Sequence, residues 1–278
     1  MYPHALDGSH FGPEMPEHLD WAIELSPVLA KHGEELVEVP GRRVVLGPAG
    51  PLDVVGSRWH PLHNREIHGF ATTIASACGG SVTHSGQDEA CRRFWCRVGL
   101  SRGRSLIVTA AHTGGGAVSV TPFAEADGAL VRVGGWAGES WPHGPTLEAR
   151  IGDGLQIARK VDAWVLESRD WEKLASRTKL APGVFVDACA GMFPSRARTA
   201  QREANRRAVL NDIAGKWQSR SGGEMDAWTA LVAICLWLDE ERPALPADRR
   251  ELSFDIGGWV ARAKSHAWGT ISSAVSGS

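Results

Sequence analysis

Residues 104–113, Arg-Ser-Leu-Ile-Val-Thr-Ala-Ala-His-Thr, give the strongest fold expectation in this 278-residue chain. Residues 106–108 form a short apolar run of the kind that builds a buried strand. The two alanines that follow allow close approach of a neighbouring backbone and leave His112 at the end of the strand. Because the unperturbed pKa of imidazole lies nearest to neutrality, His112 is a candidate general base.

The residues around this stretch predict more strands than helices. Short apolar runs separated by turn residues predict strands at 94–100, 106–110, 118–120 and 129–133, a succession that suits a barrel. Residues 35–56 contain β-branched runs between Pro-Gly and Gly-Pro-Ala-Gly-Pro turns, which indicates a hairpin or meander. We therefore expect a mixed, β-rich α+β chain with a chymotrypsin-like β-barrel at its centre.

Helices are expected at both ends of the chain. Residues 16–31 carry a rough helical stripe interrupted by a proline. Residues 199–217 read as a polar amphipathic helix, and 259–268 as a C-terminal helix. Periodicity leaves open whether residues 66–78 and 227–238 form strands or helices.

Composition restricts the partners and the compartment. The formal net charge is −2, so the chain as a whole suggests neither nucleic acid nor a membrane as a partner. Twelve tryptophans suggest self-assembly through Trp-rich surfaces. The sequence shows no signal peptide, which would begin with a charged stretch followed by an apolar one. The longest apolar run is too short to span a bilayer. We expect a soluble, intracellular, cytoplasmic protein, and the odd, irregular cysteines argue against a disulfide framework. The five cysteines are Cys78, Cys91, Cys96, Cys189 and Cys235.

The sequence of residues 104–113 resembles the histidine box of the trypsin-like (chymotrypsin-fold) serine peptidases, with Thr113 at the usual Cys position. Asp162, in Val-Asp-Ala-Trp-Val-Leu, is similar to the acidic box of that family, an Asp followed by an apolar strand. Ser221, in Ser-Arg-Ser-Gly-Gly, is similar to the family pattern Gly-Asp-Ser-Gly-Gly. The resemblance covers roughly residues 66–240 and is closest to viral-type or degenerate members.

The resemblance implies a serine endopeptidase acting on a polypeptide substrate without a cofactor or metal. Ser221 would attack the peptide carbonyl, His112 would take its proton, and Asp162 would orient His112. Backbone amides near Ser221 would hold the oxyanion, although Ser219 and Arg220 depart from the family pattern at that turn. This implies three segments. Residues 1–65 would form an arm, helix and meander, 66–240 a peptidase-like domain, and 241–278 a helical tail.

Plain structural interpretations of the same residues stay open. Asp162 could lie at the edge of a strand or helix, and Ser221 could lie in a Ser-Gly-Gly loop between two helices. A non-enzymatic viral coat or accessory protein that assembles with itself or others is a further alternative, suggested by the tryptophans and the altered serine box.

A second resemblance competes with the peptidase. Residues 222–231 are similar to the Asp-Ala-Leu helix of predicted RNase H-like nucleases. That α/β fold would make a strand of residues 184–194 and gather Asp162, Asp187 and Asp226 around Mg²⁺ for a two-metal cut. The expected Asp of its first strand is missing at residues 98–101.

Zinc-ligand types also gather between residues 60 and 96, but without a Cys-x₂-Cys pair. Surface histidines and buried thiols are the simpler interpretation. The residues concerned are His60, His63, His68, Cys78, His84, Cys91 and Cys96.

Overall fold

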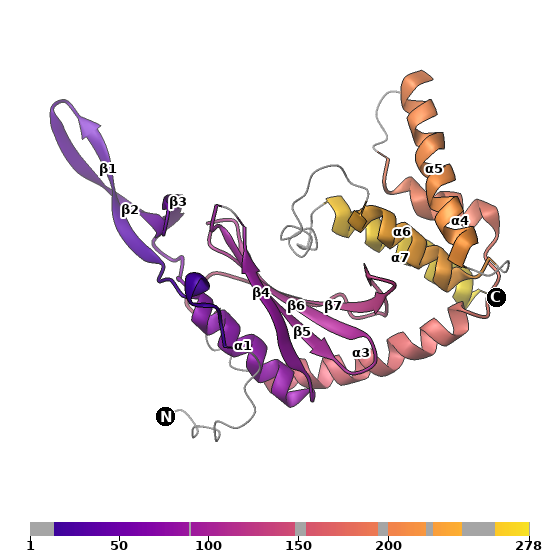
Figure 1. The fold of residues 1–278 in the computed structure, drawn as a ribbon. Helices are drawn as coiled ribbons and strands as arrows, with labels where there is room; N and C mark the ends of the chain where they lie inside the picture. Colours follow the sequence, from indigo (N-terminus) through magenta and orange to yellow (C-terminus); the bar gives the residue numbers. More distant parts are fainter. Residues whose placement is uncertain are drawn as a thin grey trace. The chain divides into compact units, whose positions relative to one another are not determined.

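The computed structural model describes residues 14–88, 90–147, 154–193, 200–220, 225–240 and 259–277. The fold is mixed α+β with antiparallel sheets (Figure 1). The strands are β1 (Glu24–His32), β2 (Glu35–Gly47), β3 (Gly50–Gly56), β4 (Ser81–Gln87), β5 (Arg93–Leu100), β6 (Arg104–Ala111), β7 (Ala117–Ala126), β8 (Ala129–Val131) and β9 (Glu139–Pro142). The helices are η1 (Glu17–Leu19), α1 (Asn64–Ala77), α3 (Gly154–Ala175), α4 (Pro182–Ala190), α5 (Ala200–Arg220), α6 (Ala227–Glu240) and α7 (Trp259–Ser276).

The chain divides into two compact units, each built from two separate stretches of sequence. One unit consists of Met1–Thr121 and Gly138–Asp162, and the other of Pro122–Ala137 and Ala163–Ser278. Strand β7 and helix α3 each contribute residues to both units.

The first sheet has the strand order β1-β2-β3. Its inner face packs Val45, Leu52 and Val55 with Trp59 in a small core. The helix expected over residues 16–31 is wrong, because this stretch forms η1 and then β1. Pro27 is compatible with β1 because β1 is an edge strand, where proline is tolerated.

Beyond this core, β1 and β2 continue as a two-stranded ribbon, residues 29–38, which runs past the end of β3 (Figure 1). The pairing register shifts between Pro27 and Leu29, so the β1–β2 ladder is interrupted at the base of the ribbon. At its tip, His32 pairs with Glu35 around a two-residue turn, and Gly33 supplies the positive φ of 64° that this turn needs.

The second sheet has the order β4-β5-β6-β7-β8, with β9 also paired to β7. It confirms the strands expected at 94–100, 106–110, 118–120 and 129–133 within a few residues. Helix α1 packs against β4, β5 and β6, and nearly all of β6 is buried. In the described part of the chain the sheet is open and no closed barrel forms, since β4 pairs only with β5 and β8 only with β7.

The second unit is mainly helical, with an apolar core assembled from α4, α5, α6 and α7 together with β8. Phe185 and Trp217 stack within it at 4.5 Å between ring centroids. Residues 227–238 belong to a buried helix, α6. The strand that the nuclease alternative requires at 184–194 is wrong, because Pro182 opens helix α4 there.

A buried ion pair joins three elements of this core. Lys264 Nζ donates to Asp239 Oδ1 at 2.7 Å and to the Leu130 carbonyl at 2.6 Å. The Leu130 N–H in turn donates to Asp239 Oδ2 at 3.1 Å. Both charged side chains are at most 1% exposed, so α6, α7 and β8 are held by charges that water does not reach. Among the helices described here, none has both the length and the apolar character that a bilayer span requires.

Candidate functional site

His112 follows directly after buried strand β6, as the sequence predicts. The side chain is completely buried, and its Nε2 lies 2.8 Å from Asn64 Oδ1. The amide of Asn64 donates to the Leu19 carbonyl at 2.8 Å, which leaves its Oδ1 as an acceptor. Nε2 of His112 must therefore carry the proton, and Nδ1 holds a lone pair without a partner among the described residues.

Other rings surround His112. The Trp21 ring meets it edge-on at 5.4 Å, and His143 stacks on Trp59 at 5.0 Å. Burial, with smaller contributions from the nearby His143 and His63, lowers the pKa of His112 to about 3. The imidazole is therefore neutral at physiological pH, and its side chain is buried.

Asp162 is not a hydrogen-bond partner of His112 in this structure. It is exposed on α3, and its carboxylate makes no hydrogen bond or ion pair with any described residue. The apolar strand expected after it is wrong, because residues 163–166 are helical. Burial raises the pKa of the Cys78 thiol to about 11, and the charge of Asp162 adds to that rise. Asn64, which sequence spacing does not single out, is the side chain that orients His112.

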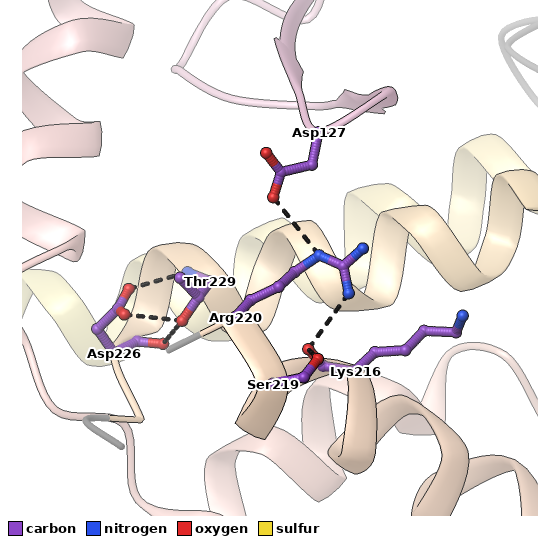
Figure 2. Close-up of polar contacts among 6 residues, drawn as sticks. All are labelled: Asp127, Lys216, Ser219, Arg220, Asp226 and Thr229. Carbon is purple, nitrogen blue, oxygen red and sulfur yellow. Dashed lines mark hydrogen bonds and ion pairs between the residues drawn. The ribbon is translucent and has the colours of Figure 1, made fainter. Parts of the chain in front are cut away.

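Ser221 lies outside the described residues, between the end of α5 at Arg220 and the start of α6 at Ala227 in the sequence (Figure 2). On one side, Arg220 ends α5 and pairs with Asp127 at 3.5 Å between Nε and Oδ2. Ser219 donates its hydroxyl to the Lys216 carbonyl at 2.9 Å. Residues 231–234, in the stretch whose periodicity allows either a strand or a helix, belong to α6.

On the other side of Ser221, Asp226 caps the beginning of α6 (Figure 2). Its Oδ1 accepts the backbone N–H of Thr229 at 2.9 Å, and its Oδ2 accepts the Thr229 hydroxyl at 2.7 Å. Both carboxylate oxygens are thus used by the helix terminus.

The carboxylates of the nuclease alternative and the residues of the zinc hypothesis do not form a metal centre in the described parts of the chain. No group of three or more His, Cys, Asp or Glu there could hold a metal ion. Asp187 is exposed on α4, and Asp226 is engaged as a helix cap. All five cysteines are free, and burial raises the pKa of Cys96 to about 12.

The ribbon at residues 29–38 is a surface that sequence reasoning did not identify. Four of the seven large apolar side chains exposed in the described residues lie on the first sheet, and three of these are on the ribbon. Leu29 is 55% exposed, Leu36 67% and Val37 47%. A strand pair with both faces in water gains little stability from burial, so exposed leucines on it point to a contact.

Comparisons with known proteins give no family assignment for this chain. No protein-family model matches the chain, and neither a characterised protein nor a solved structure matches it.

Proposed function

We propose that this chain is a non-enzymatic assembly protein that docks on other protein surfaces through its ribbon. The observation that carries the proposal is the exposure of Leu29 and Leu36 on one face of a two-stranded element that no other described segment covers. An unpaired, exposed strand edge is normally blunted or covered, because it offers both apolar side chains and free backbone groups to another chain.

The charges of the ribbon favour a specific protein contact over non-specific hydrophobic association. Lys31, Glu34, Glu35 and Glu38 lie among its apolar side chains. Aliphatic side chains bordered by charges are typical of reversible protein interfaces, where the apolar part supplies affinity and the charges select the partner.

The ribbon can be tested with a paired substitution. Leu29→Ser with Leu36→Ser should abolish association with protein partners, measured by sedimentation velocity and by capture on the immobilised chain. The matched control is Leu166→Ser with Leu174→Ser, which removes two leucines of 62% and 50% exposure from α3. Equal association of the two double variants would reject the proposal.

A serine endopeptidase remains a second candidate, favoured by the position of His112 directly after β6 and by its free Nδ1 lone pair. In this candidate Ser221 is the nucleophile and cleaves a polypeptide. Asn64 takes the orienting role first given to Asp162, and the chymotrypsin-like barrel is part of the same hypothesis. The complete burial of His112 speaks against it. A fluorophosphonate probe should label the wild type and fail on Ser221→Ala; an unlabelled wild type would end this candidate.

A further inference from the structure

We infer that the partner of the ribbon is the ribbon of a second copy of this chain, packed face to face across a two-fold axis. This inference rests on the proposed function and names the partner of the same surface.

One face of the ribbon carries four exposed side chains. The register pairs Leu29 with Glu38 and Lys31 with Leu36. Paired residues share a face, and so do residues two apart on one strand, so these four side chains stand together. They form a square with the two leucines on one diagonal and the two opposite charges on the other.

This square is complementary to itself in one orientation. A two-fold axis along the Leu29–Leu36 diagonal places each leucine against the same leucine of the partner copy, and each Lys31 against Glu38. Two-fold axes along or across the strands would instead place a charge on a leucine. The favoured arrangement is isologous and crosses the strands steeply, as in orthogonal sheet packing.

The opposite face of the ribbon fits this role less well. It carries Ala30, His32, Glu35 and Val37, so Val37 is its one large apolar side chain. Since apolar area removed from water supplies the affinity, the face with two leucines is the stronger contact. Val37→Ser therefore serves as the matched control on the same ribbon.

Charge reversal tests the symmetry directly. Lys31→Glu alone and Glu38→Lys alone should each weaken self-association by on the order of tenfold or more, because like charges then meet twice per dimer. The double variant Lys31→Glu/Glu38→Lys should restore it. An equimolar mixture of the two single variants should also restore it as a heterodimer, since the Lys31→Glu chain then meets the Glu38→Lys chain with opposite charges.

Sedimentation velocity over a concentration series at low and high salt measures these effects, with circular dichroism as the check on folding. Loss with each single variant, rescue by the double variant and by the mixture, and unchanged association of Val37→Ser support the inference. A wild type that stays monomeric up to its solubility limit, or single variants without rescue, overturns it. If Leu29→Ser/Leu36→Ser then still abolishes capture of a different protein, the proposed docking function stands and only the self-pairing is wrong. If that variant changes neither measurement, both are wrong.

Discussion

His112 Nε2 lies 2.8 Å from Asn64 Oδ1, and neither side chain is exposed to solvent. Asn64→Leu would leave a buried imidazole N–H without its acceptor, so we expect a loss of about 1–3 kcal/mol in the free energy of unfolding. The double variant Asn64→Leu/His112→Leu removes both polar partners and should lose less than the sum of the two single variants. Urea denaturation measures both, and strict additivity would show that the pair is not coupled.

Acid should destabilise the fold through the same histidine. The pKa of His112 is lowered to about 3 in the folded chain, against 6.5 for an ordinary imidazole. Between these two values the unfolded chain binds the extra proton, so stability is fully present above about pH 6.5 and is lost as the pH falls. The slope from this residue should be about 1.4 kcal/mol per pH unit. Denaturation curves from pH 7.5 to 4.5 should be flatter for His112→Gln; an equal slope would contradict this account.

The buried pair of Lys264 and Asp239 should be far more sensitive than a surface pair. Lys264→Met or Asp239→Leu alone strands an opposite charge in the core and should cost roughly 3–5 kcal/mol. The double variant should recover most of that loss. Lys160→Met is the control, since Lys160 is half exposed in its pair with Glu139 and should cost less than about 1 kcal/mol. Similar losses for Lys160→Met and Lys264→Met would refute the importance of burial.

The cap of α6 gives a smaller and more local effect. Asp226→Ala should destabilise the second unit by about 1 kcal/mol, because the Thr229 N–H loses its acceptor. Asp226→Ser, which keeps a capping oxygen, should retain most of the stability. Thermal denaturation followed by circular dichroism distinguishes the two variants, and equal melting temperatures would argue against a capping role.

The sequence predicted the local β structure best. The strands between residues 94 and 133 are connected by short turns, so each apolar run finds its partner nearby. His112 at the end of β6 follows from the same local pattern. By contrast, β1 depends on pairing with β2, and its Pro27 suggested a broken helix.

The resemblance implies an apolar strand after Asp162, whereas the spacing of the apolar residues there is that of a helix. Around Asp162, the buried residues Ile157, Val161, Trp164 and Ser168 follow a helical repeat that was visible in the sequence. The Asn64–His112 contact joins residues 48 positions apart, and no spacing rule predicts such a pair. The segment boundaries at 65/66 and 240/241 stay predictions.

The register shift between Pro27 and Leu29 separates binding from folding within one strand pair. The base of the strand pair, before the shift, contributes side chains to the small core of the first sheet. The tip, residues 29–38, contributes none of the residues of that core. Substitutions beyond the shift leave the contacts of Val45, Leu52 and Val55 untouched, so a change at the tip alters what the ribbon binds without loss of the core that holds the base. The ribbon tip of this chain is therefore the place where a new binding preference can be engineered while the fold is kept.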